Sequence, residues 1–177
     1  SARALVVAID DLQEVERQYV VNSAKREAEI SELRANARDT EKFSAKEREE
    51  MLTRAAELEK QNLEDYKVIA AERLRIMEEE ARRNADTSDE TKDKIAQARA
   101  ELFKAEKSYN DGMRRLNREL NSARKEQAAE EKKLHEEALK RIEERKSKEL
   151  SAVRFMQDLI TQQIKDESTR QIAEEQI

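Results

Sequence analysis

Apolar residues recur through residues 1–84 at spacings of three and four. Such spacing places them on one narrow face of an α-helix, and its repetition in sevens is typical of coiled coils. A change of phase near Leu63 is a stutter, which alters supercoil winding without ending a helix. This half is therefore predicted to be one long helical arm. Its apolar positions include Leu5, Ile9, Leu12, Tyr19, Ile30, Leu33, Ala37, Met51, Leu58, Leu63, Ala70 and Met77.

The same spacing continues through residues 95–177 and predicts a second helical arm. The pattern thins near Leu134 and recovers at Leu139. The positions that carry it are Ile95, Ala98, Leu102, Ala105, Tyr109, Met113, Leu116, Leu120, Ala123, Leu134, Leu139, Ile142, Val153, Met156, Ile160 and Ile164.

Between the arms, residues 85–94 read ADTSDETKDK and offer no side chain larger than alanine to a core. Thr87 and Glu90 match a capping box, and Asp86 competes with the helix backbone for hydrogen bonds. This segment is predicted to be a hinge at which the chain folds back. An uninterrupted rod is the alternative, because Met77 stays in register with Ile95 across the segment.

Mirrored apolar content about this hinge favours the hairpin over the rod. The apolar-rich ends of the chain come together in an antiparallel pairing, and the two weakest stretches, 36–50 and 126–140, fall opposite each other. The prediction is an all-α protein: one elongated helical domain over residues 1–177, folded as a long antiparallel hairpin or extended helical bundle with coiled-coil packing. The expected neighbours are Leu12 with Ile164, Val20 with Met156, Leu63 with Met113, and Leu74 with Leu102.

Two further positions are candidate breaks in the arms. Ser44 followed by Glu47 matches a capping box within the weak stretch 36–50. Asn110 and Gly112 tolerate left-handed backbone, although a lone helical glycine is equally consistent with a continuous helix. Either break would supply extra helices for a three- or four-helix bundle.

Composition supports long helices and excludes several classes of protein. Charged residues make up 44% of the chain, with no proline and one glycine, and the net charge is −5. Interspersed charges of both signs are typical of helix flanks and do not favour nucleic acid. Disorder shares this composition but lacks sustained apolar periodicity. No apolar run is long enough to insert into a membrane, and the absence of cysteine excludes thiol chemistry.

Candidate chemical residues have simpler structural interpretations. His135 is the sole histidine, and its sequence HEEAL is not a zinc-protease motif because position 139 is Leu. Asp86, Asp89 and Asp93 lack the order of a calcium loop and suit the start of a helix.

The densest basic cluster contains Arg114, Arg115 and Arg118, and Glu119 follows it at once. A helix flank explains this cluster better than a nucleic-acid site. No phosphate-binding or nucleophile motif occurs. We therefore predict no catalytic, cofactor-binding or metal-binding residue, no cofactor, no small-molecule substrate and no enzymatic activity.

With 31 Glu and 24 Ala and no Cys, arranged as a long antiparallel pair around residues 85–94, the chain resembles the glutamic acid/alanine-rich surface coat proteins of African trypanosomes. These proteins are extended helical bundles. The resemblance implies a densely packed, lipid-anchored (GPI) coat in which the rod stands off the membrane, with its anchor signal beyond Ile177. It carries no functional residue over.

The function expected from these features is spatial: a non-catalytic, elongated helical coat or spacer protein at a cell surface. The alternative is an intracellular, cytoplasmic or cytoskeletal coiled-coil scaffold that dimerises and binds protein partners. The expected partners are the protein itself, neighbouring coat molecules or other coiled-coil proteins.

Overall fold

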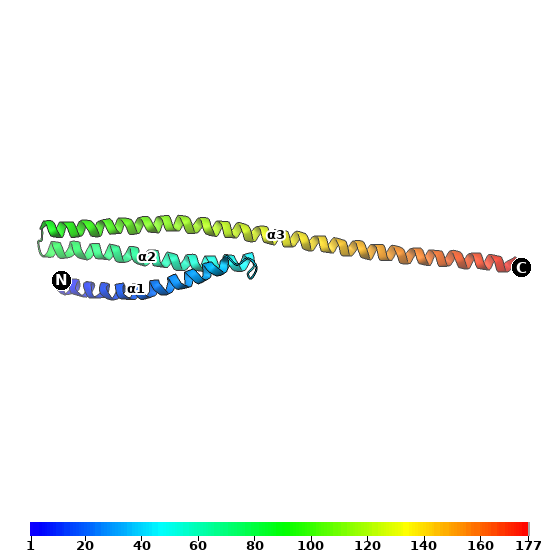
Figure 1. Ribbon diagram of the computed structural model, residues 1–177, viewed down its shortest axis with the longest axis horizontal. Helices are drawn as coiled ribbons and strands as arrows, with labels where there is room; N and C mark the ends of the chain where they lie inside the picture. The colour runs from blue at the N-terminus through cyan, green and yellow to red at the C-terminus, as the bar shows by residue number, and fades with distance from the viewer. Residues whose placement is uncertain (177) are drawn as a thin grey trace. The chain divides into compact units, whose positions relative to one another are not determined.

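A computed structural model describes residues 1–176, and the chain folds as three long antiparallel helices with no strand among the described residues. The helices are α1 (Ala2–Ala37), α2 (Ala45–Arg83) and α3 (Asp89–Glu175) (Figure 1). The prediction of an all-α bundle of long antiparallel helices is confirmed. The chain divides into two compact units, Ser1–Ala128 and Ala129–Ile177.

Residues 1–84 form two helices. The prediction that they form one long helical arm is therefore wrong. α1 ends at Ala37, and α2 begins after Ser44. The candidate capping box is present: Ser44 Oγ accepts from the backbone N–H of Glu47, and the Glu47 carboxylate accepts from the N–H of Ser44. Asp39 stabilises the turn by accepting from the backbone N–H groups of Glu41 and Lys42. These local hydrogen bonds end the heptad pattern without any proline.

The second turn lies in the predicted hinge but is shorter than predicted, because α3 already begins at Asp89. Ala85 adopts a left-handed conformation with φ of 47°, and the backbone N–H of Asp86 donates to the carbonyl of Ala81. This is the Schellman arrangement that closes helix C-termini. The predicted Thr87–Glu90 capping box is not the cap of α3. Instead, Ser88 Oγ accepts from the N–H of Thr91.

Replacing Ala85 by glycine is expected to raise the free energy of unfolding by about 0.5–1 kcal/mol. A Cβ atom makes the left-handed region unfavourable by about 1–2 kcal/mol, part of which is offset by the greater freedom of glycine in the unfolded chain. Urea unfolding followed by circular dichroism measures the change. Ala100→Gly, at an exposed position inside α3, is the control and should cost about 1 kcal/mol. Equal losses at both positions would contradict the left-handed assignment.

The stability of this turn is expected to depend on pH through the carboxylate of Asp86. The hydroxyl of Thr91 and the backbone N–H of Ser88 donate to its carboxylate and lower the pKa of Asp86 from 3.8 to about 2. Because the folded pKa is the lower one, the stabilisation is present above about pH 4 and is lost as the pH falls towards 2. An NMR titration of the Asp86 carboxyl carbon measures this pKa directly. Thr91→Val should move it back towards 3.8, and an unchanged midpoint would rule out the Thr91 contribution.

The core of the Ser1–Ala128 unit is a narrow seam of small and branched apolar residues. Ile30 of α1 packs with Ala55 and Leu58 of α2, and Leu33 lies against this cluster. Alanine lets the helix backbones approach closely, and Ala55 is completely buried. Among residues 1–176, every buried side chain is apolar. A seam this thin leaves the flanks of the helices to polar contacts.

Pairing between α2 and α3 is close to the predicted register. Leu63 lies against Gly112, one residue from its predicted partner Met113, and Arg99 contacts Glu78 on the other side of the turn. Asn110 and Gly112 do not break the helix, because α3 continues through both. Residues 1–37 do not prolong α2 as a single arm, because the chain turns back after Ala37 and α1 packs on α2.

Residues of α1 pair with α2. Arg26 and Arg34 of α1 contact Asp65 and Glu59 of α2. The predicted pairs Leu12–Ile164 and Val20–Met156 each join residues of different units, and Val20, Met156 and Ile164 are all more than half exposed. The turn at residues 38–44 gives α1 a nearer partner on α2.

The Ala129–Ile177 unit contains the remainder of α3. Its described residues from 131 to 176 are all exposed. Its helix is continuous to Glu175.

Candidate functional site

The residues considered for chemistry lie apart or serve as structural contacts. His135 is exposed, in the Ala129–Ile177 unit, and Asp86 belongs to the turn before α3. Arg114 and Arg118 are exposed, whereas Arg115 contacts Glu59 of α2. Within residues 1–176, no group of three or more His, Cys, Asp or Glu side chains is placed to hold a metal ion.

Ionic contacts between helices are the main polar feature of the Ser1–Ala128 unit, and α2 makes most of them. They run along α2 from Arg48 and Glu49 at its start to Glu78 near its end. Helix flanks beside an apolar seam are where such pairs select the neighbouring helix and its register. The pairs with α1 are Glu16–Arg73, Arg26–Asp65, Glu29–Arg54 and Arg34–Glu59, and those with α3 are Arg48–Glu126, Glu49–Arg124, Glu59–Arg115, Arg73–Glu101 and Glu78–Arg99.

One cluster, the Glu59 clamp, joins all three helices and consists of Arg34, Glu59, Arg115 and Glu119. Glu59 accepts from Arg34 of α1 at 2.8 Å and from Arg115 of α3. Arg34 also donates to Glu119 of α3 at 3.1 Å. The side chain of Glu59 is 19% exposed and that of Arg34 is 26% exposed, so water screens these pairs less than it screens a surface pair. The clamp holds α1 and α3 at one register on α2.

A second cluster, the Arg73 clamp, lies fourteen residues further along α2 and has the opposite charge at its centre. Arg73 Nε donates to Glu16 of α1 at 2.5 Å, and its Nη1 lies 3.5 Å from Glu101 of α3. Hydrogen bonding to Glu16 raises the pKa of Arg73 above its ordinary value. Fourteen residues are two heptads, so both clamps lie on the same side of α2. Tyr66 lies midway between them on α2, and its ring is tilted by 30° to that of Tyr19, with ring centroids 6.4 Å apart.

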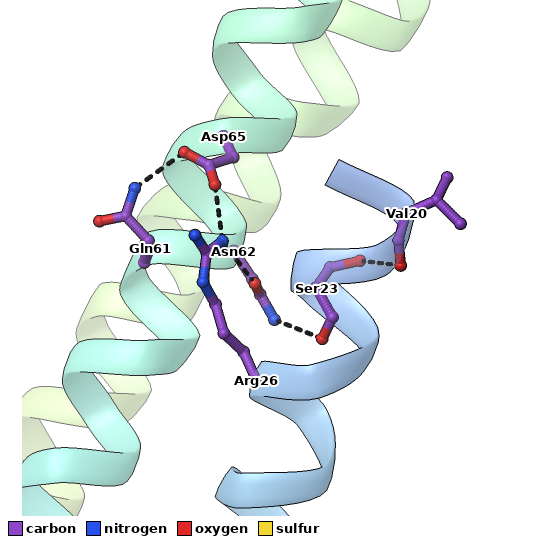
Figure 2. A network of polar contacts seen from close by, with 6 residues as sticks. All are labelled: Val20, Ser23, Arg26, Gln61, Asn62 and Asp65. Atoms are coloured by element: carbon purple, nitrogen blue, oxygen red, sulfur yellow. Dashed lines mark hydrogen bonds and ion pairs between the residues drawn. The ribbon is translucent and has the colours of Figure 1, made fainter. Parts of the chain in front are cut away.

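A polar network between the clamps fixes α1 against α2 (Figure 2). Arg26 donates to Asp65 at 2.6 Å and to the side-chain oxygen of Asn62 at 3.1 Å. The amide nitrogen of Asn62 donates to the backbone carbonyl of Ser23, and Gln61 donates to Asp65. Asn62 thus uses both ends of its amide across the interface, which makes the contact specific for one register.

The clamps do not stand out in the sequence, because charged residues of both signs are spread along the whole chain. One signal could have found them: Glu59, Tyr66 and Arg73 recur at heptad spacing on α2. Their partners become apparent only after the chain is folded back at residues 38–44 as well as at the hinge.

A different surface, here called the C-terminal stripe, lies on α3 in the Ala129–Ile177 unit. Its members follow one another at helical spacing, so they share one face of the helix. Each is between 47% and 61% exposed. The stripe consists of Leu139, Ile142, Leu150, Val153, Met156, Ile160 and Ile164.

No protein-family model matches this chain, and comparisons with curated proteins and with solved structures likewise find no match. Among the helices of residues 1–176, none combines the length and apolar character needed to cross a membrane.

Proposed function

We propose that this protein is a non-catalytic structural protein whose helical bundle acts as a coat or spacer at a cell surface. The observation that carries the proposal is the distribution of ionic contacts along α2. A spacer must keep its length when it is compressed. The two clamps connect α2 to both α1 and α3 at two separate positions, Glu59 and Arg73. At 1.5 Å per residue, the 39 residues of α2 extend over about 58 Å.

The charged flanks also suit dense packing of many copies. Charges of both signs are interspersed along the chain, and its net charge is only −5. Neighbouring molecules can therefore approach closely without strong mutual repulsion. The likeness in composition to trypanosome coat proteins supports the same function.

Labelling of cells from the source organism tests the location. Antibodies against the chain should bind intact cells, and a phospholipase that cleaves glycosylphosphatidylinositol should release the protein from them. Binding only after the cells are made permeable would overturn the surface proposal. A cytosolic protein of known location serves as the control for intact membranes.

The alternative function, an intracellular scaffold that dimerises and binds protein partners, is favoured by the C-terminal stripe. A scaffold requires a helical face left available to other chains, and the stripe is such a face. Signal confined to permeabilised cells, in filaments or at discrete structures, would support this function over the coat.

A further inference from the structure

The N-terminal three-quarters of α1 lies on α2 without burying a side chain. None of the first 29 residues is buried, and the buried residues of α1 are Ile30 and Ala37 near its end. By contrast, α2 buries side chains between Ala45 and Ile76, and α3 buries them between Ala98 and Ala123. The α2–α3 pair is therefore closely packed over its length, whereas α1 is anchored in the core only by its last turns.

The residues of α1 that face inward include a polar block. These residues are at least partly buried and follow one another at spacings of three and four, as in a coiled coil. Four consecutive positions of the series, from Glu16 to Arg26, carry polar groups. Polar residues in such a seam fix its register at a cost in stability. The series is Leu5, Ile9, Leu12, Glu16, Tyr19, Ser23, Arg26, Ile30, Leu33 and Ala37.

Ionic contacts hold the polar block on α2. Glu16 accepts from Arg73 at 2.5 Å, and Arg26 donates to Asp65 at 2.6 Å. Water reaches both pairs, since the side chains of Glu16 and Arg73 are 31% and 37% exposed and that of Asp65 is 31% exposed. Salt screens partly exposed pairs, so these contacts weaken as the ionic strength rises.

Residues 2–26 are also a poor helix by themselves. Five of them are valine, and β-branched side chains lose rotamer freedom in a helix. Most of the stability of a helix in a protein comes from packing of its apolar face. Here the inward-facing Leu5, Ile9 and Leu12 are only partly buried. The segment therefore depends on its contacts with α2 to remain helical.

We propose that residues 2–26 form a strap, the α1 strap, which detaches from α2 and unfolds in a salt-dependent manner while the rest of the Ser1–Ala128 unit stays folded. Ile30 and Leu33 remain in the core cluster with α2 and anchor the strap. Segments with few buried contacts open at a lower free energy than the whole fold. Because α2 and α3 stay paired, opening does not shorten them, so the inference holds for a coat and for a scaffold.

Opening uncovers a strip of α2 that the closed strap covers. Ile69 is only 4% exposed. It lies with Tyr66 in a groove of about 460 Å³ whose other wall includes Tyr19 and Val20 of the strap, so the strap does not fill this interface. The open state presents Ile69 and the ring of Tyr66 to solvent beside the guanidinium of Arg73. An apolar and basic surface is thus available only when the strap is open.

Hydrogen exchange of the unmodified full chain tests the proposal. Relative to the rates of unfolded peptides, amides of residues 8–26 should exchange at least about tenfold faster than those of residues 53–76 of α2. Raising the salt to about 1 M NaCl, where the Debye length is about 3 Å, should increase this ratio. Equal protection of the two segments, or a ratio that does not change with salt, would overturn the proposal.

Arg73→Met should open the α1 strap more often, because it removes the partner of Glu16. Exchange of the strap amides should rise about fivefold. Arg75→Met is the matched control, since Arg75 pairs with Glu72 of its own helix. It should leave exchange of the strap unchanged, and equal effects of the two variants would count against an ionic contact that closes the strap.

A single cysteine beneath the strap measures opening independently, because the chain has no cysteine of its own. Ile69→Cys should react with a maleimide at a rate that rises with salt. Leu116→Cys is the control, because Leu116 is just as buried, at 3% exposed, but lies on α3 next to Arg115 of the Glu59 clamp. It should stay protected while the unit is folded. Equal reaction rates would mean that the whole unit opens at once, and the strap would then not exist.

Discussion

Replacing Gly112 by valine is expected to lower the free energy of unfolding by about 2 kcal/mol or more. Gly112 is buried on α3, and a Cβ atom placed there would lie 2.5 Å from Cδ1 of Leu63 on α2. Real Cβ atoms do not approach carbon that closely, so the two helices must separate or Leu63 must leave its rotamer. Denaturant unfolding of the variant and of the unmodified chain measures the difference.

The same contact predicts a change of sign in a second background. Gly112→Ala should be neutral or destabilising in the unmodified chain, where its methyl group meets Leu63. With Leu63→Ala already present, the methyl group has room, and the higher helix propensity of alanine should stabilise the protein by about 1 kcal/mol. The same effect in both backgrounds would contradict the close approach of α2 and α3 at this point.

The apolar pattern predicted the turn before α3 because a gap in that pattern marks a segment with no side chains for a core. Residues 85–94 contain nothing that a core could use, and the chain turns within them. The same argument predicted the register of α2 on α3 to within one residue. Leu63 lies against Gly112, and its predicted partner was Met113. The spacing of apolar residues predicts helix pairing well where a short turn allows a helix only one partner helix.

Heptad patterns could not decide the partner of α1. An apolar stripe specifies which face of a helix is buried, but a similar stripe on α2 or on the end of α3 can cover it. The choice depends on the turn at residues 38–44, which a few local hydrogen bonds of about 1 kcal/mol each determine. Energies of this size are difficult to rank from sequence. For this reason the prediction of a single helical arm was wrong at residues 38–44.

The Glu59 and Arg73 clamps could not be predicted from the sequence for a related reason. Glu59 resembles any other glutamate in a chain with 31 of them. Its environment arises only when Arg34 and Arg115, distant in sequence, arrive from two other helices. The same holds for Gly112, whose role is apparent only once α2 lies beside it.

Replacing Glu59 by glutamine is expected to lower the free energy of unfolding by about 1–2 kcal/mol. The change preserves size and helix propensity but removes the carboxylate that Arg34 and Arg115 share. Thermal or urea unfolding at low ionic strength measures the loss, and part of it should disappear in concentrated salt, which screens the more exposed Arg115. Glu57→Gln, two residues away with a side chain 64% exposed, is the control and should change stability by less than about 0.5 kcal/mol.

A double-mutant cycle between Glu59 and Arg34 then separates the clamp from general charge effects. If Glu59 holds α1 and α3 together on α2, Glu59→Gln should cost less once Arg34→Met has removed one of its partners. The remaining cost should reflect Arg115 alone. Strict additivity of Glu59→Gln and Arg34→Met would mean that the two side chains do not interact in solution, and the clamp would then have no part in holding the bundle at one register.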